Sequence, residues 1–161
     1  MSQTLSPKRV CESAMNDQTS IVFPNDLNAL GTLFGGRVLE KADLAAAIVA
    51  QRHAGRVCIT LGVDSVRFLA PARGGDLLVL QSSVNRVWRT SMEVGVKASA
   101  EDVGTGARRH IFSAYFTYVG VDEHFQPTPI APAVAESPDE VRRYEQAERR
   151  RQGRVQEKSK E

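Results

Sequence analysis

Two polar residues, Asn28 and Asp43, have side chains that could act together on a carbonyl group. Asn28 belongs to a run rich in Asn, Asp, Gly and Pro, the residue types that loops favour. Asp43 follows fifteen positions later, in a segment with many alanines. A carboxylate among alanines loses hydration and becomes a better proton acceptor. We therefore predict that Asp43 acts as general base or nucleophile, while Asn28 positions water or a carbonyl.

Two glycines, Gly35 and Gly36, lie between these residues at the predicted start of a helix. Their backbone N–H groups have no side chain over them, and the dipole at a helix N-terminus favours developing negative charge. We predict an oxyanion site at this pair. A simpler interpretation stays open, in which Asn28 stabilises a turn, the glycines only begin the helix and Asp43 is an edge residue in water.

The segment 37–53 has the apolar periodicity of an α-helix. One continuous apolar arc on the helical wheel contains Val38, Leu39, Ala42, Ala45, Ala46, Val49 and Ala50. Leu44 and Ile48 interrupt the polar side, so we expect this helix to be covered on more than one face. The β-branched run 19–23 before the loop predicts a first strand.

Four apolar segments after the helix are predicted as strands, because they are rich in β-branched and aromatic residues and end at turn residues. They cover residues 57–69, 76–88, 91–100 and 108–121. Successive strands joined by short turns form an antiparallel meander, and one helix can bury its concave face. The predicted fold class is therefore α+β. The apolar surface left over on the helix predicts at least a symmetric dimer.

The two ends of the chain differ from this central part. Residues 1–18 are polar and lack periodicity, which predicts a flexible arm. A proline-rich stretch after the last strand leads to Ser137, Pro138 and Glu140, which form a strong helix start. The helix that follows is rich in arginine. It can be a solvated helix laced by ion pairs, or a contact for phosphate or nucleic acid.

Composition excludes several classes of function. A chain of 161 residues predicts one domain, and a formal charge of +2 is too weak to indicate nucleic acid. Two cysteines, Cys11 and Cys58, provide neither a disulfide framework nor a metal site. The N-terminus lacks the apolar core of a signal peptide, and no apolar run approaches bilayer length. We expect a cytoplasmic protein without a metal, a nucleic-acid partner or a membrane span.

The loop and the helix together carry a motif that resembles a known family. The motif is P-x-D-x-N-x-x-G-x-x-F-G-G, followed by a helix with a single Asp and then A-x-R-H. It resembles the hotdog-fold acyl-CoA thioesterases, in the branch of cytosolic acyl-CoA hydrolases and their bacterial relatives. Its positions are occupied here by Pro24, Asp26, Asn28, Gly31, Phe34, Gly35, Gly36, Asp43, Ala50, Arg52 and His53.

The resemblance implies a hotdog fold, in which a five- or six-stranded antiparallel sheet wraps the long helix. The chain then divides into the arm 1–18, a hotdog domain over 19–122, and a proline-rich linker with a basic C-terminal helix over 123–161. In similar proteins two units pair, and trimers of dimers are usual. Asn28 and Asp43 match the catalytic pair of the family, so each site should take Asn28 from one subunit and Asp43 from the other.

The implied activity is hydrolysis of fatty acyl-CoA to free fatty acid and coenzyme A, with no cofactor apart from the coenzyme A in the substrate. Family contacts to coenzyme A match Leu61, Gly62, Val63, Thr90, Ser91, Met92 and Arg151. Two alternatives stay open. A hotdog dehydratase needs a His beside a carboxylate, and the loop and first helical turns contain none. A non-catalytic acyl-CoA-binding regulator would not need Asn28 and Asp43 together.

Overall fold

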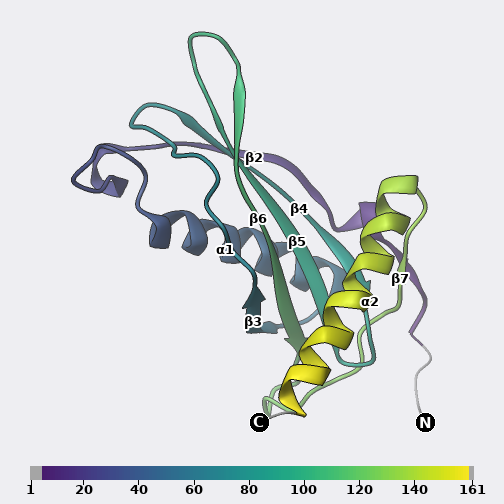
Figure 1. Ribbon diagram of the computed structural model, residues 1–161. Coiled ribbons are helices and arrows are strands. Elements are labelled where there is room, and N and C mark those ends of the chain that lie inside the picture. The colour runs from purple at the N-terminus through teal and green to yellow at the C-terminus, as the bar shows by residue number, and fades with distance from the viewer. Residues whose placement is uncertain (1–4, 160–161) are drawn as a thin grey trace.

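The computed structural model describes residues 5–159, and it has the predicted α+β architecture (Figure 1). Its α-helices are α1 (Gly35–Ala54) and α2 (Pro138–Lys158). Its strands are β1 (Lys8–Arg9), β2 (Met15–Ile21), β3 (Cys58–Asp64), β4 (Leu77–Val87), β5 (Ser91–Glu101), β6 (Arg108–Gly120) and β7 (Ala133–Val134). Short 3₁₀ turns at Val10–Glu12 and Pro24–Asp26 precede β2 and α1, respectively.

Five of the strands form one antiparallel sheet in the order β2-β4-β5-β6-β3. The strands β4, β5 and β6 pair in chain order, as the meander predicted. The prediction is wrong for β3, which pairs with β6 at the sheet edge, where Cys58 lies opposite Gly120. The connection from Asp64 to Leu77 is long enough to cross the sheet, and a short turn would not be. A small parallel pair of β1 and β7 lies apart from this sheet.

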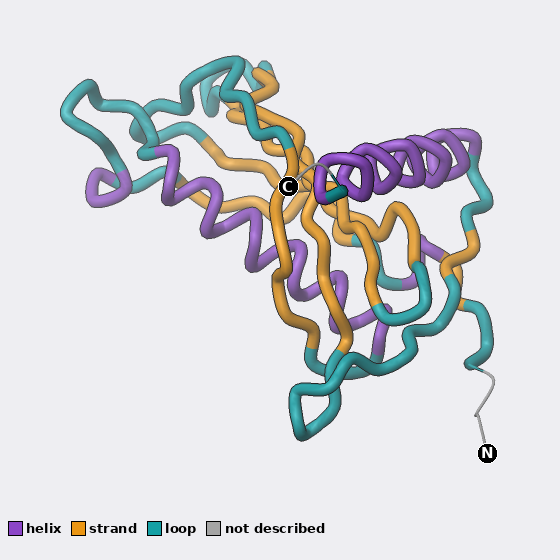
Figure 2. Tube along the Cα trace, turned by 60° about the horizontal axis from the view of Figure 1, so that its bottom comes forward, coloured by secondary structure: helices purple, strands orange, loops and turns teal. Residues whose placement is uncertain are grey.

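The sheet curves around α1, whose small residues form the centre of the core (Figure 1). Alanines on one face of α1 are fully buried, so the strands approach the helix closely. From the sheet, the rings of Phe112, Phe116 and Tyr118 complete the core. Gly55 ends α1 in the left-handed conformation, with φ 64°. Figure 2 shows α1 and α2 on opposite sides of the sheet.

The predicted flexible arm needs a correction. Residues 1–4 lie outside the described residues, but β1 pairs with β7 and Val10 is buried. The strand β2 begins at Met15 and pairs with β4, four positions before the predicted start of the first strand. Backbone hydrogen bonds to β4 and β7 stabilise this polar segment, and such long-range bonds leave no periodicity in the sequence.

The C-terminal helix begins as predicted. The side chain of Ser137 accepts from the backbone N–H of Glu140, and the Glu140 carboxylate accepts in return from the backbone N–H of Ser137. This capping box, with Pro138 in the first turn, fixes the start of α2. Neither of the helices in the described part of the chain combines the length and the apolar character that crossing a membrane requires.

Candidate active site

Asp43 lies in α1 on the side that faces β3 and β6. The hydroxyl of Tyr118 donates to Asp43, and it lies 2.5 Å from Oδ1 and 2.8 Å from the backbone carbonyl oxygen. Thr60 Oγ1 donates to the same Oδ1 at 2.9 Å. Burial and the hydrogen bond to Asp43 raise the pKa of Tyr118, so the phenol keeps its proton. The two hydroxyls therefore hold Oδ1, and Oδ2 has no hydrogen-bond partner within residues 5–159.

Thr60 and Tyr118 are parts of this site that the sequence did not reveal. They lie directly opposite each other in the β3–β6 ladder, so their side chains are on the same face of the sheet. Only the correct strand order could have brought them together in a prediction. The predicted meander placed β3 beside β4 and therefore kept these two residues apart.

Asn28 lies in the exposed loop before α1, and its side chain binds that loop. Oδ1 accepts from the backbone N–H groups of Leu30 and Thr32 at 2.9 and 3.2 Å, and Nδ2 donates to Thr32 Oγ1 at 2.9 Å. Within one chain Asn28 therefore stabilises its turn. No hydrogen bond joins Asn28 to Asp43 inside the described residues of a single chain. A joint catalytic role stays a prediction, and it requires a second subunit.

The predicted oxyanion site lies at the first turn of α1. Phe34, the residue before the helix, provides no side-chain cap. Across residues 5–159, the N–H groups of Gly35 and Gly36 donate to no protein acceptor. A Cβ atom at Gly36 would lie 2.9 Å from the ring of Phe34, so a larger residue would force the ring to move. Two free donors at a helix N-terminus suit a developing oxyanion.

Four residues implied for coenzyme A binding line one groove, which we call the β3–α2 groove. They are Leu61 and Gly62 of β3, Ser91 of β5 and Arg151 of α2, around a volume of about 370 Å³. The guanidinium of Arg151 lies 4.6 Å from the centre of the Trp88 ring, which also lines the groove. Among the described residues, Arg151 has no carboxylate at ion-pair distance. Its charge is therefore available to an anionic ligand.

The other implied contacts lie elsewhere. Met92 is fully buried in the core, because successive residues of a strand face opposite sides and Ser91 faces the groove. The Met92 side chain therefore does not reach the groove within one chain, and a contact to coenzyme A at this residue stays a prediction. Val63 is exposed on the edge strand β3, and Thr90 is half-buried in the turn before β5. Neither of them lines the β3–α2 groove.

A buried ion pair docks α2 on the outer face of the sheet. Glu93 of β5 is 0% exposed, and Arg150 donates to both of its carboxylate oxygens at 2.6 and 3.1 Å. Asn85 Nδ2 donates to the same carboxylate at 2.9 Å, and the Arg150 guanidinium lies 3.5 Å from the centre of the Tyr115 ring. Arg154 forms an ion pair with Asp64. These arginines hold α2 against the sheet. They are therefore neither part of a solvated helix laced by its own ion pairs nor free to contact phosphate or nucleic acid, the two roles predicted for this helix.

Metal-ligand groups and cysteines are other possible parts of such a site. Within the described residues there is no group of three or more His, Cys, Asp or Glu side chains that could hold a metal ion. Burial raises the pKa of the Cys58 thiol to about 11, so the thiol stays protonated and is a poor nucleophile at neutral pH. The predicted chemistry of this region uses Asp43, and the structure adds the two hydroxyls that bind it.

Known proteins resemble this chain in sequence. A profile described as Thioesterase superfamily matches residues 30–107. A Bacillus subtilis protein named uncharacterized acyl-CoA thioester hydrolase YkhA is 38% identical over 133 residues, which are 83% of this chain and 77% of that protein. The Helicobacter pylori protein VdlD is 37% identical over 84% of this chain and 77% of its own length.

Solved structures agree with these relatives. A hexameric acyl-CoA thioesterase is 37% identical, with a TM-score of 0.91 over 95% of this chain and 97% of that chain. An acyl-CoA hydrolase from Staphylococcus aureus, in complex with butyryl coenzyme A, coenzyme A and coenzyme A disulfide, is 33% identical, with a TM-score of 0.85 over 95% of each chain. The sheet wrapped around α1 is thus the hotdog fold of thioesterases. The chain belongs to the thioesterase superfamily, in the family of acyl-CoA thioester hydrolases.

Proposed function

We propose that this chain hydrolyses the thioester bond of fatty acyl-CoA and releases a free fatty acid and coenzyme A. The observation that carries the proposal is the Asp43 carboxylate, which two hydroxyls hold through Oδ1 while Oδ2 is left free. The names of the Bacillus subtilis and Staphylococcus aureus relatives support it. The Staphylococcus aureus enzyme has also been solved as variants in which an aspartate, an asparagine or a threonine is changed to alanine.

In the proposed reaction the thioester carbonyl oxygen accepts hydrogen bonds from the N–H groups of Gly35 and Gly36. Asp43 Oδ2 removes a proton from a water molecule, whose oxygen attacks the carbonyl carbon. The tetrahedral intermediate then collapses, the carbon–sulfur bond breaks, and coenzyme A leaves as a thiolate. Direct attack by Oδ2 on the carbonyl carbon, through an anhydride, is the competing route. Both routes use the same free oxygen.

The proposed site is completed by a second copy of the chain, with Asn28 from one subunit and Asp43 from the other. The edge strand β3 is exposed along most of its length, and Ile59, Leu61 and Val63 expose apolar side chains there. On α1, Leu44 is 59% exposed and Ile48 is 37% exposed. An unpaired edge beside apolar surface favours pairing of two copies. Relatives named as hexameric support a trimer of such dimers.

The free charge of Arg151 should bind a phosphate group of coenzyme A in the β3–α2 groove. We expect Arg151→Ala to raise KM for acyl-CoA about tenfold or more, because a hydrogen bond to a charged group is lost, while kcat stays within about twofold. Steady-state kinetics and calorimetric titration with coenzyme A measure the effect. Arg149→Ala, at an exposed neighbouring position of α2, is the matched control. An unchanged KM in Arg151→Ala would remove this residue from the binding site.

One assay tests the proposed function directly. Purified protein should release free thiol from acetyl-, hexanoyl- and palmitoyl-CoA, followed with a thiol reagent, and release should survive dialysis against a chelator because no cofactor is proposed. Binding of these ligands without thiol release would favour the alternative, an acyl-CoA-binding regulator.

A cytoplasmic location is also proposed, and a rat relative named cytosolic acyl coenzyme A thioester hydrolase supports it.

The hydroxyl of Tyr118 should be needed to orient the Asp43 carboxylate. We expect Tyr118→Phe to lower kcat about ten- to a hundredfold, the range for loss of one hydrogen bond to a charged group, with KM within about twofold. Tyr115→Phe, in the same strand, is the control, since its ring lies under Arg150 and is retained. Initial rates over a range of acyl-CoA concentrations separate the two constants. Wild-type kcat in Tyr118→Phe would show that Thr60 alone orients the carboxylate.

A further inference from the structure

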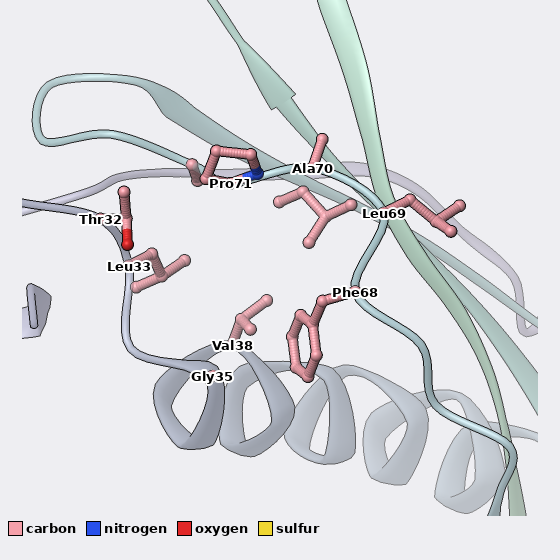
Figure 3. A pocket seen from close by; sticks show the side chains of 10 residues that line it. Thr32, Leu33, Gly35, Val38, Phe68, Leu69, Ala70 and Pro71 are labelled. Carbon is pink, nitrogen blue, oxygen red and sulfur yellow. The ribbon is translucent and has the colours of Figure 1, made fainter. Parts of the chain in front are cut away.

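A second cavity, of about 370 Å³, lies between the start of α1 and the segment 68–72 that crosses from β3 to β4. Figure 3 shows Leu33, Val38 and Phe68 around this space, beneath the segment that carries Ala70. Ile111 also lines it. Thr32 contributes the one hydroxyl in the lining, and that hydroxyl is hydrogen-bonded to Asn28. None of the residues 5–159 that line the cavity has a charged side chain, so it suits an apolar ligand.

The position of the cavity decides which apolar ligand it fits. Gly35 forms part of the wall and also carries one of the two free N–H groups at the start of α1. A thioester whose carbonyl oxygen binds that N–H group has its first methylene groups at the mouth of the cavity. The β3–α2 groove, which fits the coenzyme A part, has a different set of lining residues. The cavity is therefore free to take the other end of the same substrate.

Phe68 is placed to limit the depth of the cavity. Its ring packs edge-on against Phe112, with centroids 5.5 Å apart and an interplanar angle of 75°. The tip of the ring would lie 3.3 Å from a Cβ atom at Gly35, so the ring closes the space over the first turn of α1. Phe68 is nevertheless 51% exposed, so its truncation should open the cavity at the cost of the edge-on packing against Phe112.

We propose that this cavity binds the acyl tail of the substrate and that Phe68 determines the chain length it accepts. The inference rests on the proposed thioesterase function. A methylene group is close in size to a water molecule, whose share of liquid volume is about 30 Å³, so the cavity accepts a saturated tail of up to roughly ten to twelve carbons. Longer tails do not fit behind the Phe68 ring and gain nothing further from the cavity.

The test is kcat/KM for saturated acyl-CoA substrates from two to sixteen carbons. In the wild-type protein we expect kcat/KM to rise about fourfold for each added methylene and to level off near ten to twelve carbons. Phe68→Ala should move this plateau to chains longer by two or more carbons. Ala70→Leu, which fills the cavity, should move it to shorter chains. Val103→Ala, at an exposed position in the β5–β6 turn that does not line the cavity, is the matched control and should keep the wild-type profile.

The outcomes separate this inference from the proposed function. If the wild-type protein releases no thiol from any chain length, the proposed function fails. If it releases thiol but both cavity variants keep the wild-type length profile, the thioesterase function stands and the acyl tail binds elsewhere. Melting temperatures and coenzyme A affinities of both variants, compared with Val103→Ala, show that a changed profile does not come from misfolding.

Discussion

Replacing Asp43 by asparagine should lower kcat for thioester hydrolysis about a hundred- to ten-thousandfold. Asparagine has nearly the same shape, and its Oδ1 can still accept from Tyr118 and Thr60, as the carboxylate does. The amide that replaces Oδ2 can neither accept a proton at neutral pH nor attack a carbonyl carbon. Coenzyme A affinity should stay within about twofold, because the β3–α2 groove does not include Asp43. Single-turnover thiol release and calorimetry measure the two quantities.

A control and a mixing experiment make this result specific. Glu40→Gln removes another carboxylate of α1, one that pairs with Arg37 at the exposed side, and should keep the wild-type rate.

A mixing experiment tests whether the two residues come from different subunits. Inactive Asn28→Ala and Asp43→Asn chains are unfolded, mixed in equal amounts and refolded. They should recover about a quarter of the wild-type activity, because half of the dimers are mixed and each mixed dimer has one intact site. No recovery would show that both residues act within one chain. A wild-type rate in Asp43→Asn would refute the mechanism.

Local patterns in the sequence predicted the helices well. The apolar arc over 37–53 became α1, Gly35–Ala54, and the capping residues placed the start of α2 at Pro138. Both signals come from residues within one or two helical turns of each other. The same local signal placed Gly35 and Gly36 at the start of α1 and Asp43 within it, while their role in one active site stays a prediction.

Long-range pairing accounts for what the sequence did not predict. The position of β3 beside β6 brings Thr60 to Tyr118, and no local pattern contains that information. In β4, strict alternation along the strand would put Arg86 and Trp88 on the same face as Val84. A β-bulge between Val84 and Arg86 shifts the register, and both side chains turn outward, where they bind Glu148 of α2. The basic helix is thus a docked element of the fold, which its charge alone did not indicate.

The largest effect on stability should come from Arg150→Met. The Glu93 carboxylate is fully buried, and Arg150 is the only side chain that binds both of its oxygens within the described residues. Arg150→Met leaves the buried carboxylate with Asn85 and with Arg154, whose guanidinium lies 3.7 Å from Oε2. Loss of the main partner of a buried ion pair costs up to about 3–5 kcal/mol. For a chain of this length, that loss should lower Tm by about 10 °C. Thermal and urea unfolding measure it, and Arg149→Met on the exposed side of α2 should change neither value.

A double variant distinguishes the charge from the packing. Glu93→Gln combined with Arg150→Met removes the buried charge together with its partner, so it should be more stable than Arg150→Met alone. The remaining loss then measures the contact between the guanidinium and the Tyr115 ring, which lies 3.5 Å away. If the single and double variants unfold at the same temperature, packing against Tyr115, rather than the ion pair with Glu93, holds α2 to the sheet. Because Arg151 is the next residue of α2, the same contact also fixes where the arginine of the β3–α2 groove lies.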